Sequence, residues 1–379
     1  MTDESLPCSR EEAARAFGFA PEAIEADSLQ VSATGASSDV WRVRALDGAE
    51  VRDTCIVKIA VPDHDTASPM WRTSSDPRDP WYWRREVALL SSGTLDTLPD
   101  DHIRPPRLRA VSERDDGSIA MFLEDVDGYP GIRWSFARYR VAARHVGRLH
   151  GAYLAGAPLP KTAMLSRGWL ASYVDRRSVA IGPLHERDDS NDEPRVVPDA
   201  VLKAAMRVSD ERARLVGHLS RLPQVVSHLD LHPGNLFAIR DDDGVERTVL
   251  VDWQYCGIGA IGEDIATLLM DAVLDLHVAV GDTKLLRDVL LDGYLNGLRS
   301  TAPDVDDRLV RFAVDLAATL KYWWVPIHLA NLAESAERTG SATTVDGRPF
   351  DAIAAAWSGA AREWFDLYRN MRELEHDFE

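Results

Sequence analysis

The chain has 379 residues, and its 61 acidic side chains against 43 basic ones give a formal net charge of −18. This acidity argues against a nucleic-acid partner, because phosphate backbones attract clustered Lys and Arg. A hydrophobic fraction of 45 % and a charged fraction of 27 % are ordinary for a globular protein with a large core. The sequence shows neither the basic-then-apolar pattern of a signal peptide nor an apolar run that could span a membrane. We therefore expect a cytoplasmic protein with no membrane partner.

The first 127 residues are predicted to form a β-rich part with few helices. Runs of β-favouring residues predict strands, with a turn of small residues in the first segment and an Asp-Asp-Gly turn in the last. The segment before these strands is expected to form a short amphipathic helix or a pair of turns, and apolar residues at helical spacing predict a helix between the strands. A polar, Pro-rich insertion interrupts the region. The strand segments are 29–46, 53–61 and 104–126, the helical segments are 9–26 and 81–93, and the insertion is 62–80.

The rest of the sequence is predicted to be mostly helical, with one embedded β-hairpin. Helical spacing of apolar residues occurs in 135–154, in 307–334 and from about 351 to 376. Strand character returns between 225 and 252, where an Asp-Asp-Asp-Gly run separates two apolar runs as a hairpin turn would. A charged loop is expected over 186–198. A β-rich part followed by a helical part with one hairpin is the order of elements that a kinase-type fold would give.

The sharpest local signal is HLDLHPGNLF, which ends at Phe237, followed by VLVDW, which ends at Trp253. Phosphoryl transfer needs a carboxylate that orients the attacking hydroxyl and accepts its proton, and oxygen ligands that hold Mg²⁺ against the phosphates. Asp230 and Asn235 lie on one tight Pro-Gly loop, so both can face the same cavity. The hairpin that follows can return Asp252 as a second carboxylate for the metal. The combination predicts a phosphoryl-transfer site.

These motifs resemble the catalytic and metal-binding loops of the aminoglycoside phosphotransferase superfamily, which includes choline-kinase-like enzymes. The resemblance implies that Asp230 is the catalytic base and that Asn235 and Asp252 bind Mg²⁺. His232 belongs to the same catalytic loop and stands where protein kinases carry Lys, as in the small-molecule branch. Trp253 follows the metal-binding Asp where protein kinases have Phe, which again points to phosphotransferases of small molecules.

Asp264 stands at the predicted start of a helix in the segment GIGAIGEDIATLLM. A carboxylate there offsets the helix dipole and accepts hydrogen bonds from N–H groups that have no partner inside the helix. The family resemblance gives it a structural task as well, which is to brace the catalytic loop. Both interpretations make Asp264 a supporting residue and not a reactant.

A nucleotide site is expected in the first part of the chain. In kinases a strand Lys paired with a helix Glu grips the α- and β-phosphates of ATP. Lys58 lies between apolar residues in CIVKIAV, and Glu86 in WRREVALL is the one Glu nearby in sequence. An edge-strand Lys facing solvent and an exposed Glu that pairs with Arg are the simpler alternatives.

Two further segments complete the expected nucleotide site. The turn TGASSD could cover the phosphates with the backbone N–H groups of Ser37 and Ser38, although a plain hairpin turn explains it equally well. The resemblance implies that MFLEDVDG is the hinge. There the Glu124 carbonyl and the Val126 N–H would pair with adenine, and Leu123 would line the pocket. The simpler alternative is a linker between the two lobes, and the segment could serve as both.

Together these features predict an α+β, protein-kinase-like fold with two lobes. Residues 1–127 would form the nucleotide-binding lobe, with its hinge at about 122–128, and residues 128–379 the helical catalytic and substrate-binding lobe. The expected activity is transfer of the γ-phosphoryl group of ATP, with Mg²⁺, to a hydroxyl of a small molecule. That acceptor could be an aminoglycoside-like antibiotic or a hydroxylated metabolite, and the enzyme a monomer or homodimer. The alternatives are a protein kinase and a catalytically silent nucleotide-binding module.

The acceptor end of the sequence leaves alternatives open. Trp323 and Trp324 could form an aromatic wall with His328, but an aromatic stripe is more often part of a core. The acidic residues of the last helix, among them Glu363 and Asp366, could attract an amine-bearing substrate or could be a solvated helix face.

Overall fold

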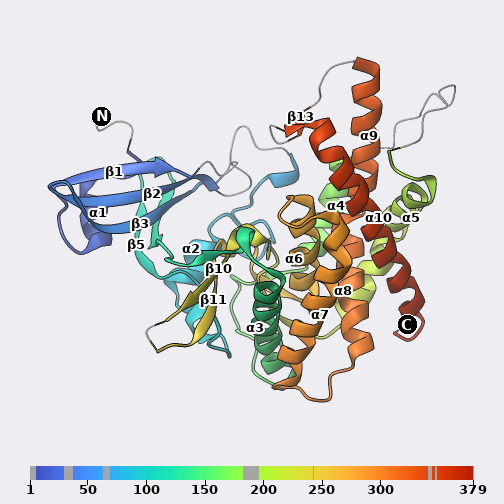
Figure 1. Ribbon diagram of the computed structural model, residues 1–379. Coiled ribbons are helices and arrows are strands. Elements are labelled where there is room, and N and C mark those ends of the chain that lie inside the picture. The colour runs from blue at the N-terminus through green and yellow to red at the C-terminus, as the bar shows by residue number, and fades with distance from the viewer. Residues whose placement is uncertain are drawn as a thin grey trace. The chain divides into compact units, whose positions relative to one another are not determined.

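The computed structural model describes residues 6–29, 37–62, 69–181, 196–241, 243–339, 344–345 and 348–378 (Figure 1). The chain forms two compact units. Unit 1 comprises 1–129, 160–167 and 237–257, and unit 2 comprises 130–159, 168–236 and 258–379.

Unit 1 is built on an antiparallel five-stranded sheet in the order β1-β2-β3-β6-β5. The buried face of its central strands, with Val43, Cys55 and Phe122, packs against helix α1. Ser9 begins that helix with a capping box, in which Ser9 and Glu12 exchange side-chain and backbone hydrogen bonds. The elements are α1 (Arg10–Phe17), β1 (Ala23–Ser28), β2 (Ser37–Asp47), β3 (Glu50–Ala60), β5 (Leu108–Glu113) and β6 (Ile119–Glu124).

A second sheet of unit 1 contains the predicted hairpin. Its strands run in the order β4-β11-β10-β7, and the hairpin turn closes with a hydrogen bond from Gly244 N to Asp241 O. Helix α2 lies between β3 and β5 in sequence. The remaining elements of unit 1 are α2 (Arg85–Ser91), β4 (Ile103–Arg104), β7 (Tyr129–Pro130), β8 (Ser166–Arg167), β10 (Leu236–Arg240) and β11 (Glu246–Leu250), with short 3₁₀ turns at Pro69–Trp71, Thr94–Thr97 and Trp253–Tyr255. Strand β12 (Gly257–Ala260) begins at the last residue of unit 1, and its other residues belong to unit 2.

Unit 2 is helical, and α6 and α8 form its buried centre. Helices α3 and α7 approach closely because Gly147, Gly293 and Gly297 face backbone atoms of the opposite helix. The elements are α3 (Phe136–Leu154), α4 (Trp169–Ala180), α5 (Asp199–Arg221), β9 (Gln224–Ser227), α6 (Glu263–Leu274), α7 (Thr283–Arg299), α8 (Asp307–Tyr322), α9 (Trp324–Thr339), β13 (Thr344–Val345), β14 (Arg348–Pro349) and α10 (Phe350–Glu375), with 3₁₀ turns at Gly131–Arg133, Pro233–Asn235 and Val280–Asp282. No described helix is both long and apolar enough to cross a bilayer.

Most predicted elements are present, but three boundaries were wrong. The segment 9–26, expected to be a short helix or a pair of turns, is helical only to Phe17 and then forms strand β1, so the first strand comes before residue 29. Helix α2 begins at Arg85, because the residues from 81 form turns. The helix predicted over 307–334 divides at Trp323. Pro326 lies in the first turn of α9, where its missing N–H leaves no helix hydrogen bond unmade.

Candidate active site

The loop after β9 presents Asp230 on a constrained backbone. Leu229 has a φ of 66°, a left-handed conformation that is unfavourable for a residue with a branched side chain. Asp264 holds this turn from the first turn of α6. Its Oδ2 accepts a hydrogen bond from His228 N at 3.0 Å, and its Oδ1 accepts one from Leu229 N at 2.8 Å. The bracing interaction expected for Asp264 is therefore present.

Asp264 is in turn held by a buried polar network. His150 Nε2 from α3 lies 3.5 Å from Asp264 Oδ2, and His150 Nδ1 lies 2.8 Å from the hydroxyl of Tyr294 on α7. That hydroxyl accepts a hydrogen bond from Gly262 N, directly before α6. Burial alone would raise the pKa of the Asp264 carboxyl, but the hydrogen bond and charge of His150, with further contributions from His228 and Leu229, hold that pKa below its usual value. The brace is thus an ionised carboxylate.

The loop also fixes Asn235 and His232 around Asp230. Asn235 Nδ2 donates to Asp230 O at 3.0 Å, which fixes the orientation of the amide. Among the described residues no donor contacts the amide oxygen of Asn235. His232 Nδ1 accepts from Gly234 N at 3.2 Å and caps the 3₁₀ turn. Among the described residues no donor contacts the half-buried Asp230 carboxylate. Its oxygens are therefore open to a hydrogen bond from a ligand.

A second carboxylate lies beside Asp230 and was not predicted from sequence. Asp271, on α6, accepts a hydrogen bond from the Tyr322 hydroxyl at 2.7 Å. Burial raises the pKa of the Asp271 carboxyl; the charges of Lys321 and His232 oppose this increase, and the charge of Asp230 adds to it. The half-buried Asp271 therefore belongs to the same electrostatic site as Asp230.

Unit 1 contains the predicted Lys–Glu ion pair. Lys58 on β3 contacts Glu86 Oε2 on α2 at 2.7 Å and Asp252 Oδ1 at 2.6 Å. Burial disfavours the charged Lys58, yet the carboxylates of Asp252 and Glu86 raise its pKa above the usual value. Glu86 Oε1 also accepts from Trp253 N at 3.1 Å. Asp252 has a φ of 62°, so its backbone, like that of Leu229, is held in a left-handed conformation.

Arg85 is a further site-supporting residue that sequence reasoning missed. Its fully buried guanidinium donates to four backbone carbonyls, those of Asp79, Pro80, Met164 and Gln254. It thereby fixes both the end of the 62–80 insertion and the segment after Asp252. No local pattern distinguishes Arg85 from the neighbouring Arg84, because backbone carbonyls have no sequence signature and two of the four, those of Met164 and Gln254, come from distant parts of the sequence.

The other expected nucleotide contacts lie on β2, on β6 and just beyond the end of β6. Ser37 and Ser38 belong to the start of strand β2, so the expectation that they form a turn was wrong. The preceding turn residues lie outside the described residues. Leu123 is buried on β6, and Glu124 uses its carboxylate to bind Arg104 in a bidentate ion pair. Within the described chain the Val126 N–H has no hydrogen-bond partner, so it is able to donate to a ligand.

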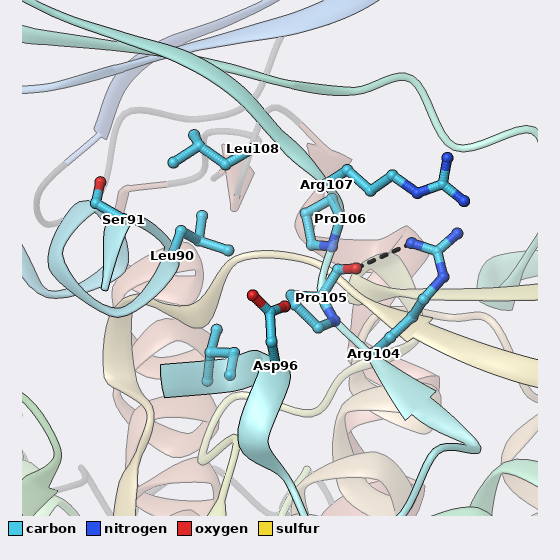
Figure 2. A pocket seen from close by; sticks show the side chains of 9 residues that line it. Leu90, Ser91, Asp96, Arg104, Pro105, Pro106, Arg107 and Leu108 are labelled. Atoms are coloured by element: carbon cyan, nitrogen blue, oxygen red, sulfur yellow. Dashed lines mark hydrogen bonds between the residues drawn. The ribbon is translucent and has the colours of Figure 1, made fainter. Parts of the chain in front are cut away.

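A pocket of about 520 Å³ lies in unit 1, between α2 and the segment that leads into β5 (Figure 2). Arg104 and Pro105 line it, and Arg104 Nη1 donates to Pro105 O at 3.0 Å. The pocket contains none of the candidate site residues.

The aromatic and acidic residues expected at the acceptor end divide between core and surface. Trp323 is 1 % exposed and belongs to the core. Trp324 is half-buried and forms an aromatic cluster with His328 and Trp357, with centroid distances of 5.7 to 6.4 Å. The charged groups that act on Glu363 are Asp366, Arg287 and Lys284. Asp230, the candidate base, is not among them. The acidic loop 186–193 lies outside the described residues.

The candidate residues fit a divalent cation and a nucleotide by their donor chemistry. Asn235 offers an amide oxygen and Asp252 a partly exposed carboxylate, and these are the hard oxygen ligands that Mg²⁺ prefers. Lys58 offers an ammonium group that is held in place by two carboxylates. Each unit therefore carries its own part of the chemistry that phosphoryl transfer requires.

The comparisons with known proteins agree with this chemistry. A family model described as the phosphotransferase enzyme family matches residues 29–303. No curated protein matches the chain. An amicoumacin kinase, solved with AMP-PNP, Ca²⁺ and Ami, shares 14 % identity with a TM-score of 0.56, over 93 % of this chain and 92 % of its own. A choline kinase from Cryptosporidium parvum shares 13 % identity with a TM-score of 0.52, over 93 % and 90 % of the two chains.

The fold is thus the mixed α+β fold of small-molecule kinases, which confirms the predicted fold class. The family model covers well over half of the sequence, and the chain belongs to the phosphotransferase enzyme family. Its class of activity is that of a small-molecule kinase.

Proposed function

We propose that the chain transfers the γ-phosphoryl group of ATP to a hydroxyl group of a small molecule, with Asp230 as the catalytic base. The observation that carries this proposal is the backbone clamp at Leu229. Asp264 accepts hydrogen bonds from two consecutive N–H groups, and the strained turn that results presents a carboxylate without a described donor. Strained backbone of this kind persists where the surrounding structure fixes it, as at active sites.

Each residue has a separate role in the proposed reaction. Asp230 accepts the proton of the acceptor hydroxyl, a contribution typically worth about 10²–10⁴ in rate. Asn235 and Asp252 would hold Mg²⁺, which neutralises charge on the phosphates when it is bound. Lys58, fixed by Glu86, would bind the α- and β-phosphates. His232 shapes the loop through its hydrogen bond from Gly234 N.

The hinge segment supports an adenine contact. Strand β6 ends at Glu124, so Val126 lies just beyond the ladder with its N–H unpaired among the described residues. The Val126 N–H and the Glu124 carbonyl, which are separated by one residue, can pair with the acceptor and donor atoms on one edge of adenine. Leu123, buried beside them, would supply the apolar surface that the base requires.

We further propose that the acceptor carries an amine as well as a hydroxyl. The support lies in Asp271, a half-buried carboxylate beside Asp230. A cationic acceptor would relieve the repulsion between the two carboxylates, which a neutral acceptor would not. The acidic residues of α10, Glu363 and Asp366, give less support because their charged neighbours lie on α7 and α10.

The test is ATP turnover against a panel of hydroxyl compounds in matched pairs, with and without an amine. Candidates include aminoglycoside-like antibiotics and small amino alcohols. We expect phosphorylation of amine-bearing members, and in D271N a KM for them that is raised about tenfold, the equivalent of about 1.4 kcal/mol. The KM of a turned-over acceptor that lacks the amine should not change. Turnover of neutral acceptors alone would contradict the amine assignment, and no turnover with any hydroxyl acceptor would contradict the activity.

A further inference from the structure

Lys321 is a buried cation that the proposed function does not yet use. It lies in the last turn of α8 and is 7 % exposed. Its Nζ lies 3.0 Å from Thr267 Oγ1 and 3.5 Å from Leu229 O. It also lies 5.1 Å from the ring centroid of Trp169 and 5.7 Å from that of Tyr322. Within the described chain no carboxylate is in ion-pair contact with it.

Such a position is costly for a lysine. An ammonium group removed from water and not in contact with a counter-ion loses most of its hydration. One hydroxyl, one long carbonyl contact and two aromatic faces replace that hydration only in part. The sequence is also sparing with this residue, since it contains five lysines, Lys58 and Lys321 among them. An apolar side chain would fit the centre of unit 2 more easily, so the charge calls for an explanation beyond packing.

The carbonyl that Lys321 contacts gives that explanation. Leu229 is the left-handed residue directly before Asp230. Asp264 binds the N–H of Leu229 and Lys321 faces its C=O, so two buried charges of opposite sign hold the two sides of one strained residue. The charge on Lys321 also acts on the carboxylate pair formed by Asp230 and Asp271, where it opposes their mutual repulsion.

We propose that Lys321 is a positioning residue for the candidate base: it fixes the Leu229 peptide from the carbonyl side, while Asp264 binds the N–H side of the same residue. This inference rests on the proposed function. It gives Lys321 no contact with the acceptor or the nucleotide. Its loss should therefore lower kcat and leave the KM values for ATP and acceptor nearly unchanged.

The experiment compares K321M, which keeps the length of the side chain and removes its charge, with the wild-type enzyme. The matched control is K284M, an exposed lysine on α7. We expect K321M to lose about 10–100-fold in kcat, part of the contribution of a general base. The KM values of K321M for ATP and acceptor should stay near those of the wild type, because Lys321 contacts neither ligand. K321R should recover part of the lost kcat, and K284M should match the wild type.

If K321M does not fold, T267V serves as the milder variant, because it removes only the hydroxyl that holds Nζ. We expect T267V to lose several-fold in kcat with nearly unchanged KM values. Wild-type kcat in K321M, or in T267V where K321M does not fold, would overturn this inference while wild-type turnover upholds the proposed function. Absence of phosphoryl transfer by the wild-type enzyme would overturn both.

Discussion

Leu229 and Asp252 are two of the three non-glycine residues with positive φ in the described chain, and each lies at a candidate site. A left-handed conformation costs a residue with a side chain about 1–2 kcal/mol. In both places buried polar groups hold the backbone: Asp264 binds Leu229 N, and Glu86 binds the N–H of Trp253, next to Asp252. Strain is therefore concentrated where the carboxylates of the proposed reaction are presented.

Glu263 is another buried carboxyl group, and the effect of its burial on stability can be tested with one substitution. It is the first residue of α6, and its Oε1 accepts a hydrogen bond from Ala260 N at 2.6 Å. Burial raises the pKa of its carboxyl from 4.5 to about 7, against the opposing effect of that hydrogen bond. Between these two pKa values the folded state holds a proton that the unfolded state has lost. The free energy of unfolding should therefore fall as pH rises from about 4.5 to about 7.

We expect E263Q, which keeps the accepting oxygen, to remove this dependence. The free energy of unfolding of E263Q minus that of the wild type should increase by up to about 3 kcal/mol as pH rises from about 4.5 to about 7, and should stay constant at higher pH. Urea unfolding at a series of pH values measures the difference. A difference independent of pH would show that Glu263 titrates normally.

At the scale of elements, the glycines between α3 and α7 set how closely two helices of unit 2 approach. A Cβ added at Gly147 would lie 2.2 Å from Tyr294 O and 3.0 Å from Gly297 Cα, both backbone atoms. We expect G147A to destabilise the protein by about 1–3 kcal/mol or more, because the helices must separate. The separation would also displace Tyr294, which belongs to the network around Asp264.

The matched control is G217A, on α5. There the added Cβ would meet nothing closer than Arg221 Nη1 at 3.8 Å. The substitution should stabilise the protein by about 1 kcal/mol, the difference in helix propensity between Gly and Ala. Both variants make the same exchange inside a helix, so the difference between their free energies of unfolding isolates the packing between α3 and α7. Equal effects would contradict the close approach of these helices.

The sequence predicts those helices and strands that a turn motif or an apolar pattern within a short segment marks. The hairpin of β10 and β11 follows from its Asp-Asp-Asp-Gly turn, and β5 and β6 follow from a similar turn. Strand β1 was missed because AIEADS is short, has no buried residue and is poor in β-branched residues. The break at Trp323 was missed because the apolar pattern continues from α8 into α9 and only Pro326 marks the new helix.

The residues of the candidate site also divide into those that a local sequence motif marks and those that no motif marks. Asp230, Asn235 and Asp252 stand out because the loop and hairpin that carry them are contiguous in sequence. Lys321 and Asp271 have no such motif, since each approaches the catalytic loop only through the packing of α8 and α6 in unit 2. Charges buried by tertiary structure become visible only when burial is known.

At the scale of the whole molecule, ligand binding should couple to stability. A nucleotide that binds only the folded chain stabilises it by about 2.7 kcal/mol at a hundredfold excess over its Kd. We expect ATP with Mg²⁺ to raise Tm, and a chelator to reduce this increase. D252A should lose the part of the increase that depends on Mg²⁺. An increase in Tm that is the same in D252A and in the wild type would contradict the assignment of Asp252 to the metal.

The central claim is that Asp230 serves as base in phosphoryl transfer to a hydroxyl. The most direct measurement follows the γ-phosphoryl group of labelled ATP into the acceptor, with wild-type enzyme and D230N assayed side by side. The account predicts a phosphorylated acceptor with the wild type. For D230N it predicts a kcat lower by about 10²–10⁴ with a nearly unchanged KM for ATP, because the carboxylate acts on the acceptor and not on the nucleotide. Transfer by D230N at the wild-type rate would contradict it.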